Sequence, residues 1–214
     1  MKVDVKLLAI TPNFLKMIWV AARTCKSHKT PYELWCEQPD EGDMLRLARN
    51  IINSGHLSVL EHCAMTFGVS GVSRALLAQY TRHRIGVSIS VQSQRAVSEA
   101  SSKNQGIFEH VIPDSIRDRE DARKAFEEEI KRIQQCYDYL KAIGIKNEDA
   151  RFILPNASTT NFVTTLNLRS LLDVYQKRVV VPGAQWEIKA MLKKMAALVV
   201  EKEPWLKEFF SDEG

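Results

Sequence analysis

Strand-like and helix-like segments follow one another along this chain in an order that does not repeat. Alternation of apolar and polar residues predicts strands near residues 3–7 and 64–70, and a β-branched, threonine-rich run predicts another at 159–166. Apolar residues spaced by three and four predict helices, the longest of which begins at Asp114 and ends at Gly144. Because these elements do not alternate as regular βαβ units, we expect an α+β fold.

Residues with helix-capping chemistry predict where the other helices begin. The expected starts are after Thr11-Pro12, at Asp43, at Ser73, at Asn167 and after Pro182-Gly183. Gly55 should end the helix that Asp43 begins, since glycine is common just past a helix C-terminus. The helix begun by Asn167 should extend to Lys177 and place Arg178 at its far end.

The composition is that of an ordinary globular protein with one sizeable core. The chain has 214 residues, 45% of them hydrophobic and 26% charged, and we expect a single domain over residues 1–214. No apolar run approaches the roughly 18 residues that would span a bilayer. Residues 1–6 lack the apolar region of a signal peptide, so a cytoplasmic protein is expected.

The cysteines and the net charge narrow the class of ligand. Four cysteines are scattered without a Cys-x-x-Cys pair, which predicts reduced thiols and no metal site. They are Cys25, Cys36, Cys63 and Cys136. The formal charge of +4 suits a nucleic-acid surface or small phosphorylated ligands. Because the arginines stand singly among apolar and hydroxyl residues, small anions are favoured.

The most unusual segment is 81–95, which reads Thr-Arg-His-Arg-Ile-Gly-Val-Ser-Ile-Ser-Val-Gln-Ser-Gln-Arg. Its first cations, Arg82, His83 and Arg84, come directly after the helix that Ser73 should begin. Positive side chains at a helix C-terminus satisfy the last carbonyl groups and the negative end of the dipole. Ordinary helix termination is therefore one interpretation of these three residues, and an anion site is the other.

Several common catalytic motifs are absent from the sequence. It has no Walker A loop, no Gly-x-Gly-x-x-Gly after a strand, no Gly-x-Ser-x-Gly elbow and no His-Glu-x-x-His helix. What remains is a set of arginines at expected element ends or in loops, where a guanidinium can hold phosphate through two hydrogen bonds. They are Arg82, Arg84, Arg95, Arg151, Arg169 and Arg178.

Four motifs together resemble the signature segments of the flavin-dependent thymidylate synthases, the ThyX family. They are His-Leu-Ser-Val-Leu-Glu-His at 56–62, Thr-Arg-His-Arg with Gln-Ser-Gln-Arg within 81–95, Asn-Leu-Arg-Ser-Leu at 167–171, and Ala-Gln-Trp-Glu-Ile at 184–188. The motifs stand in the family's order. The resemblance implies the ThyX-type fold, with a mixed sheet flanked by helices, and assembly as a homotetramer.

The resemblance implies two binding sites in which several residues have assigned roles. For FAD, the implied residues are Ser58, Glu61, Arg82, His83, Arg84, Asn167, Arg169 and Asp173, the last three from a neighbouring subunit. For dUMP, they are Gln79, Arg82, Gln92, Ser93, Gln94, Arg95, Arg151 and Arg178. By the same resemblance, Arg95 and Arg151 suit the 5′-phosphate. Arg178 would be the catalytic residue that faces the pyrimidine and favours ionisation at N3.

The implied reaction is the reductive methylation of dUMP to dTMP. In it, 5,10-methylenetetrahydrofolate supplies the carbon, FADH2 regenerated by NADPH supplies the hydride, and tetrahydrofolate is released. Neither a metal nor a nucleic acid or membrane partner is implied. The signature departs from the family's commonest form, since eight residues instead of seven separate Arg84 from Ser93, and Ala96 stands where tyrosine is frequent. The register of this loop therefore stays open.

Two other interpretations of these residues compete with this one. Ser93 could be a nucleophile, but no general base stands at a recognisable spacing from it, and the family's serine binds substrate. A nucleic-acid-binding module could use Arg82, Arg84 and Arg95 on phosphates and aromatic residues on bases. No aromatic residue lies within 81–95, and 26 acidic residues offset 30 basic ones, so this alternative is disfavoured. Bound flavin colour or a steep salt dependence would separate the two.

Overall fold

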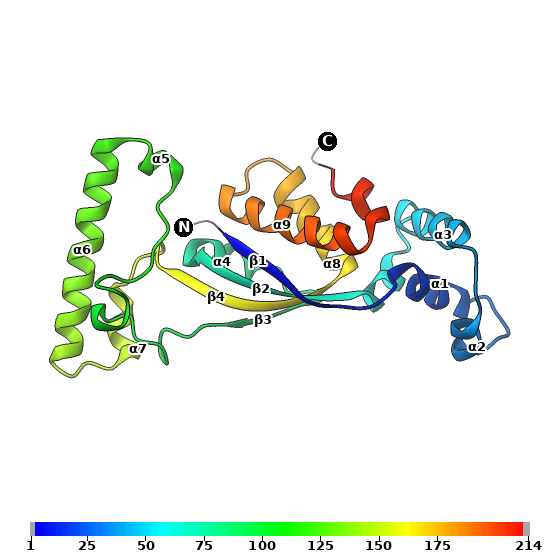
Figure 1. Ribbon diagram of the computed structural model, residues 1–214, viewed down its shortest axis with the longest axis horizontal. Coiled ribbons are helices and arrows are strands. Elements are labelled where there is room, and N and C mark those ends of the chain that lie inside the picture. Colours follow the sequence, from blue (N-terminus) through cyan, green and yellow to red (C-terminus); the bar gives the residue numbers. More distant parts are fainter. Residues whose placement is uncertain (1–2, 212–214) are drawn as a thin grey trace. The chain divides into compact units, whose positions relative to one another are not determined.

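The computed structural model describes residues 3–211. Of the first six residues, in which no signal peptide was expected, Met1 and Lys2 lie outside the described residues. Four strands form one sheet in the order β1-β2-β4-β3 (Figure 1). They are β1 (Asp4–Ile10), β2 (Ala64–Ser73), β3 (Val87–Val91) and β4 (Thr159–Asn167). The strands are antiparallel, which confirms the α+β prediction. The expected mixed sheet was wrong, because each strand runs opposite to its neighbours.

Burial alternates along the central strands, as the sequence pattern predicted. Met65 and Phe67 of β2 and Phe162, Thr164 and Leu166 of β4 are buried, and the residues that alternate with them are more exposed. The edge strand β3 was not predicted, because its burial pattern lacks a fully buried residue and its sequence is rich in serine. Strand propensity is a weak guide where no face is buried.

The chain divides into two compact units. Unit 1 comprises Val69–Thr81, Ser90–Phe162 and the first described residues, Val3 and Asp4. Unit 2 comprises Val5–Gly68, Arg82–Ile89 and the residues from Val163 onward. The boundaries fall within strands, except the one between Thr81 and Arg82, which follows α4 (Arg74–Tyr80). The single domain expected over residues 1–214 stays a prediction.

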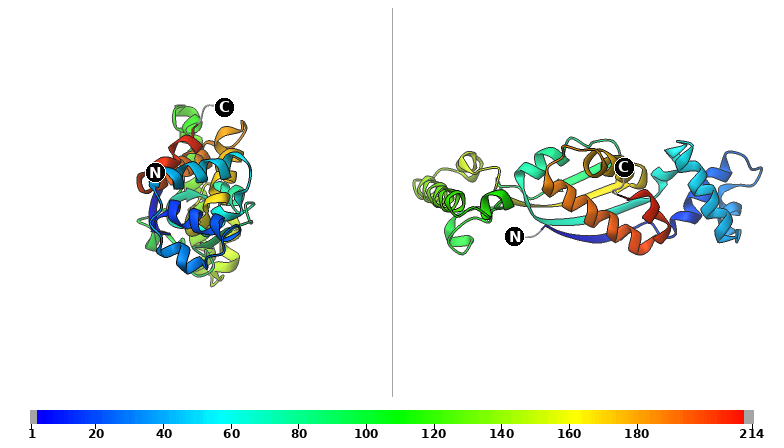
Figure 2. Two further views of the ribbon diagram at one scale, coloured as in Figure 1. Left: turned by 90° about the vertical axis from the view of Figure 1, so that its right-hand side faces the viewer. Right: turned by 90° about the horizontal axis from the view of Figure 1, so that it is seen from above.

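Unit 2 contains most of the helices. They are α1 (Phe14–Thr24), α2 (Pro31–Cys36), α3 (Glu41–Asn53), α8 (Leu168–Tyr175) and α9 (Trp186–Lys202), with 3-10 helices η1 (Leu57–His62) and η5 (Pro204–Phe209). The apolar face predicted for the closing helix α9 is buried, since Ile188, Met191, Leu192, Met195 and Val199 expose none of their surface. In Figure 1 and Figure 2, α9 is the orange helix that leads into η5, drawn in red.

Unit 1 contains the longest helix. Its helices are α4 (Arg74–Tyr80), α5 (Asp114–Arg117), α6 (Glu120–Ala142) and α7 (Asn147–Ala150), with 3-10 helices η2 (Ser101–Lys103) and η3 (Arg151–Ile153). The single helix expected from Asp114 was wrong, because the backbone is extended at Arg119 and separates α5 from α6. The Asp118 N–H bonds back to the Asp114 and Ile116 carbonyls and so closes the first helix.

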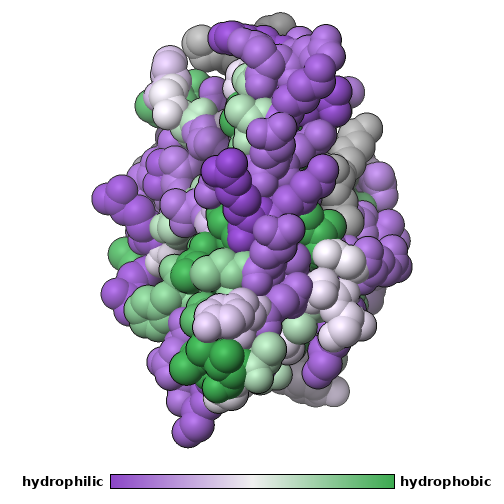
Figure 3. All heavy atoms as spheres, turned by 90° about the vertical axis from the view of Figure 1, so that its left-hand side faces the viewer, coloured by the Kyte–Doolittle hydropathy of each residue, from purple (hydrophilic) through white to green (hydrophobic). Residues whose placement is uncertain are grey.

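Most of the charged residues of α6 are exposed. The side of the molecule on which α6 lies is mainly hydrophilic, with smaller apolar areas (Figure 3). Tyr139 of α6 and Ile143, just beyond it, are 64% and 56% exposed.

Two helix starts differ from the sequence prediction. The cap of α3 is Asp40 and not Asp43, because the Asp40 carboxylate accepts a hydrogen bond from the Asp43 N–H at 3.2 Å. The first helix begins at Phe14, after Asn13 instead of Pro12. Asn13 adopts a left-handed backbone with φ of 54°, and its side chain accepts a hydrogen bond from the Lys16 N–H. This cap places the first helical residue at Phe14.

Three other boundaries confirm the prediction. Ser73 caps α4 by accepting a hydrogen bond from the Leu76 N–H at 3.0 Å. Asn167 caps α8 in the same way. Gly55 follows the end of α3 with φ of +76°, the left-handed conformation that glycine adopts at little cost.

All four cysteines are free thiols, as expected. Cys63 is buried, and burial raises the pKa of its thiol to about 12, with a smaller contribution from the Glu203 charge. The other three are exposed. Within residues 3–211, no helix is long and apolar enough to cross a membrane.

Candidate active site

The signature segment turns sharply against the start of α8 in unit 2. Gly86 has φ of +65°, and a Cβ atom there would lie 2.3 Å from Ser170 Oγ and 2.7 Å from Asn167 Nδ2. The Ser170 hydroxyl donates to the Ile85 carbonyl at 2.9 Å, and the Asn167 side chain caps α8. Only glycine fits this position, so the turn fixes the segment after Arg84 against Asn167.

An ion pair joins two predicted flavin residues that are 108 positions apart. Arg169 Nη1 lies 2.6 Å from Glu61 Oε1, with both side chains about half exposed (50% and 47%). Arg169 follows the α8 cap, and Glu61 lies on η1. Because both belong to the same chain, this contact brings Glu61 and Arg169 together within one protomer.

Four other predicted flavin residues of unit 2, Ser58, Arg82, Arg84 and Asp173, are exposed. Ser58 is exposed on η1. Asp173 is exposed and paired with Lys177, whose Nζ lies 2.8 Å away on the next helical turn. No described residue forms an ion pair with Arg82 or Arg84, both of which are exposed. Their guanidinium groups are therefore available for a ligand.

A hydrogen bond joins Arg178 to the histidine of the signature. Helix α8 ends at Tyr175 and not at Lys177, and Arg178 lies on the π-helical turn η4 (Gln176–Val180) that follows. Arg178 Nε donates to His83 Nε2 at 2.9 Å. Such π turns are frequent at functional sites, because the extra residue per turn re-aims a side chain. The sequence placed Arg178 near the helix end but gave no sign of this partner.

The pKa of His83 is lowered from its ordinary value. The first cause is burial, which disfavours the charged imidazolium, and the Arg178 and Lys177 cations add to it. Asp173 opposes the shift, and Arg82 reinforces it slightly. His83 is therefore neutral near pH 7.

The donor set of this cluster fits a flavin dinucleotide. A pyrophosphate needs guanidinium or amide donors, and Arg82, Arg84 and Arg169 supply the guanidinium groups. An isoalloxazine needs hydrogen bonds at its polar edge, which hydroxyl, amide and imidazole groups can provide. The residues expected from the sequence thus occur together in unit 2 with chemistry that suits FAD.

The remaining nucleotide residues lie in unit 1. Gln92 is bound to β4, because its N–H donates to the Asn161 carbonyl at 2.9 Å and its side-chain oxygen accepts from Asn161 Nδ2 at 2.8 Å. The loop then turns at Ser93, whose hydroxyl accepts from the Arg95 N–H at 3.2 Å. This contact engages Ser93 with the backbone and no base, so the nucleophile interpretation gains no support.

Unpaired buried polar atoms gather in unit 1. Five buried side-chain atoms have no hydrogen-bond partner among the described residues: Arg74 Nε, Gln79 Oε1, Gln94 Nε2, Ser158 Oγ and Thr160 Oγ1. Buried polar groups are nearly always satisfied in folded proteins, so these atoms need an explanation. Gln79 and Gln94 were predicted to bind dUMP. A polar ligand such as a nucleotide would satisfy them.

Arg74 and Glu99 are polar residues of this region that the sequence prediction missed. Arg74 Nη2 donates to the Gln92 carbonyl at 3.4 Å, and its cation lowers the pKa of Glu99, which burial raises more strongly. The Gln94 amide lies close enough to stabilise the Glu99 charge, although Nε2 makes no hydrogen bond of normal geometry. One signal was present in the sequence: a cation directly after the Ser73 cap opposes the helix dipole.

A basic hollow contains Arg95. It has a volume of about 310 Å³ and is lined by Arg95, Lys141, Lys146, Asn147 and Glu148. Arg151 is near this stretch in sequence, and its Nε donates to the Glu148 carbonyl at 3.1 Å. The cations of this hollow suit a phosphate group.

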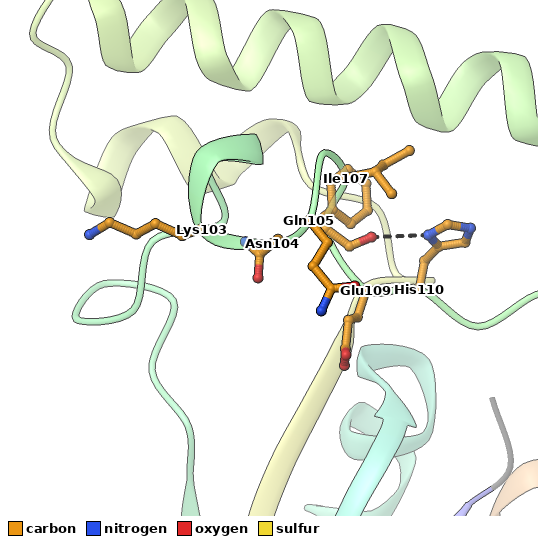
Figure 4. Close-up of a pocket in the computed structure, with 7 residues that line it drawn as sticks. Lys103, Asn104, Gln105, Ile107, Glu109 and His110 are labelled. Atoms are coloured by element: carbon orange, nitrogen blue, oxygen red, sulfur yellow. Dashed lines mark hydrogen bonds between the residues drawn. The ribbon is translucent and has the colours of Figure 1, made fainter.

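A larger hollow of about 400 Å³ contains none of the predicted site residues. Figure 4 shows its lining, which comes from the end of η2 and from the segment that follows it. The residues are Lys103, Asn104, Gln105, Ile107, Phe108, Glu109 and His110. In the described part of the chain, no three His, Cys, Asp or Glu side chains are grouped to hold a metal ion.

The two clusters present arginine and amide side chains, the donors that suit phosphorylated ligands. Residues 6–205 match the family model described as "Thymidylate synthase complementing protein". The chain belongs to the flavin-dependent thymidylate synthase family, whose enzymes methylate dUMP to dTMP with a flavin.

Relatives and solved structures agree with this assignment. The chain is 38% identical to a flavin-dependent thymidylate synthase from Geobacter sulfurreducens, over 98% of this chain and 86% of the relative. It is 35% identical to one from Nitratidesulfovibrio vulgaris, with the same coverage. Its fold matches Helicobacter pylori ThyX, solved with FAD and dUMP, at a TM-score of 0.75 and 22% identity, over 98% of this chain and 99% of that one. A UMP/dUMP methylase, PolB from Streptomyces cacaoi bound with 5-Br dUMP, matches at a TM-score of 0.81 and 22% identity, with 98% and 94% covered.

Proposed function

We propose that this chain catalyses the reductive methylation of dUMP to dTMP, with 5,10-methylenetetrahydrofolate as the carbon donor and NADPH as the source of reducing equivalents. The observation that carries the proposal is the position of Arg178 on η4, bonded to His83 of the signature segment within the cluster suited to FAD. Tetrahydrofolate would be released without oxidation.

The flavin would be held by the residues of unit 2. Arg82, Arg84 and Arg169 would bind its pyrophosphate, while Ser58, Glu61, His83 and Asn167 would serve its polar groups, with Asp173 at the margin. When bound, FAD would supply the hydride that reduces the transferred carbon to a methyl group. The Glu61–Arg169 ion pair supports this arrangement by fixing two of these side chains before the cofactor binds.

The nucleotide would be held mainly by residues of unit 1. Gln79 and Gln94 would use their unpaired amide atoms on polar groups of dUMP, and Arg95 and Arg151 would bind its phosphate. Gln92 and Ser93 would contribute through the loop that Asn161 anchors. Arg82 would contribute to both ligands.

Arg178 would be the catalytic residue. Its Nε is occupied by His83, so its two Nη groups are the ones that can face the pyrimidine. A fixed guanidinium beside N3 favours ionisation of the ring and stabilises negative charge that develops during the reaction. No covalent bond between the protein and dUMP is required.

The chain would act as a homotetramer whose subunits share the sites. The exposed Tyr139 and Ile143 support a covered surface near the C-terminal end of α6. Asn167, Arg169 and Asp173 would reach each flavin from a neighbouring subunit.

A single-turnover assay tests the proposal. FAD-loaded protein would be reduced with dithionite under anaerobic conditions and given dUMP and methylenetetrahydrofolate, and dTMP would be measured by chromatography. We expect dTMP from the native chain and yellow colour in the purified protein. Protein that binds no flavin and forms no dTMP would overturn the assignment.

A further inference from the structure

The Arg178–His83 hydrogen bond determines the protonation state of His83. A guanidinium has only donors, so His83 Nε2 must accept and cannot carry a proton. The imidazole is then neutral, with its proton on Nδ1. This conclusion follows from the 2.9 Å contact and from the chemistry of the two groups.

The charges around His83 favour the same state. Arg178 and Lys177 face it from η4, Arg82 precedes it in the chain, and Asp173 of α8 is the one acidic group that favours its protonated form. Lys177 partly neutralises Asp173 through their 2.8 Å ion pair. Three cations therefore oppose a fourth positive charge at this position.

We propose that His83 is a positioning residue for Arg178: the neutral imidazole holds the guanidinium through Nε, and protonation of His83 releases it. This inference rests on the proposed function and deepens it, because it assigns to His83 a role other than contact with the flavin. With Nε held, the Nη groups keep one orientation towards the pyrimidine. An imidazolium would remove the acceptor and place a cation against Arg178.

The direction of the pH effect follows from these charges. The pKa of His83 lies below its ordinary value of 6.5, so the active, neutral form predominates at neutral pH. The rate of dTMP formation should fall in acid, as His83 becomes protonated. This loss of rate in acid should be absent from a variant in which the group that accepts the hydrogen bond from Arg178 does not titrate.

The functional test compares native protein, His83→Gln and His110→Gln in single turnovers at saturating dUMP, over a range of pH. A glutamine carbonyl can accept from Arg178 Nε but carries no titrating proton, so we expect dTMP formation with the acid loss shifted or removed. His110, in unit 1, is the matched control, because it is also partly buried and bonds the Phe108 carbonyl, yet lies outside the predicted sites. Its variant should keep the native profile. Bound flavin per chain is measured in each protein.

An unchanged acid loss in His83→Gln would overturn the inference. So would a loss of activity that follows the loss of bound flavin, since His83 would then act through the cofactor.

A second test, by nuclear magnetic resonance, does not depend on activity. Nitrogen-15 spectra of the histidine rings should show His83 with its proton on Nδ1, and Arg178→Leu should raise its titration midpoint by removing the nearest cation. A His83 ring protonated on Nε2 at neutral pH would overturn the positioning bond. If the spectra agree but native protein forms no dTMP, the proposed function fails, and the assigned role in the reaction fails with it.

Discussion

The two units hold their candidate residues in different ways. In unit 2, side chains distant in sequence contact one another: Glu61 pairs with Arg169, Arg178 bonds His83, and Ser170 bonds the signature backbone. In unit 1, the buried atoms of Gln79 and Gln94 have no partner among the described residues. The first cluster is arranged by the protein itself, whereas the second has polar groups that a ligand could satisfy.

This difference indicates how each cluster would respond to change. A contact that the protein already makes contributes to stability and to geometry, so its loss should affect folding or rate. A buried donor or acceptor without a partner lowers stability until a ligand reaches it, so changes there should affect ligand affinity instead. Variants in the two units therefore separate these effects.

The largest effect should come from Gly86→Ala in unit 2. The positive φ and the Cβ contact of 2.3 Å with Ser170 Oγ would both have to be relieved. We expect a loss of about 3–5 kcal/mol in the free energy of unfolding. Urea unfolding measures it, together with flavin content.

Gly55→Ala is the matched control for that change. Gly55 also has a positive φ, but nothing lies within 4 Å of its Cβ position. It should lose only about 1–2 kcal/mol, from backbone strain alone. Equal losses in the two variants would show that the packing of the signature against α8 contributes nothing.

Arg178→Ala should be next in size. Loss of one preorganised charge at developing negative charge lowers the rate by about 10²–10³-fold. Bound flavin and dUMP affinity should change much less, as judged by absorbance and by titration. Arg46→Ala, on the exposed surface of α3, is the matched arginine control and should keep the native rate. An undiminished rate in Arg178→Ala would remove the catalytic role.

Arg95→Ala should affect affinity more than rate. Loss of a charge-assisted hydrogen bond to phosphate is worth about 1.5–3 kcal/mol, which corresponds to a roughly 10–100-fold weaker dUMP complex. Calorimetric titration with dUMP checks this, with Arg132→Ala on α6 as the control. If Arg95→Ala lost rate at saturating dUMP but kept its affinity, the contrast between the units would be wrong.

Glu99→Gln should give the smallest effect, visible only as a change with pH. Burial raises the pKa of Glu99 above 4.5, so between that value and the raised one the folded protein retains a proton that the unfolded chain has lost. The free energy of unfolding of the native protein must then fall as pH rises through this window. Glutamine removes that slope, so the stability of the variant relative to native should increase with pH. Urea midpoints measured across the window test the sign.

The sequence predicted most elements because local chemistry decides them. Strict alternation gave β2, β-branched residues gave β4, and the caps Ser73 and Asn167 gave the starts of α4 and α8. The prediction missed β3, whose pairing on β4 leaves much of it exposed. It also missed the break at Arg119, where no proline or glycine marks the end of α5.

The candidate residues were likewise predicted more fully than their contacts. The order of the motifs indicated the flavin-dependent family, and through it the candidate roles of Glu61, Arg169, His83 and Arg178. No local pattern indicated that Arg178 would bond His83, because the two are 95 positions apart and their meeting depends on the π-helical turn. Arg74 and Glu99 were missed, since neither belongs to a motif.

By itself, the sequence determined the class of the fold, the starts of α4 and α8 and the family, and it named the candidate site residues. These depend on hydrophobic periodicity, capping and motif spacing, which are local properties of the chain. The tertiary structure decided the antiparallel pairing, the ion pair between η1 and α8, the Arg178–His83 hydrogen bond and the division of the candidate residues between two units. Those features depend on contacts between distant segments and on burial, which only the folded chain establishes.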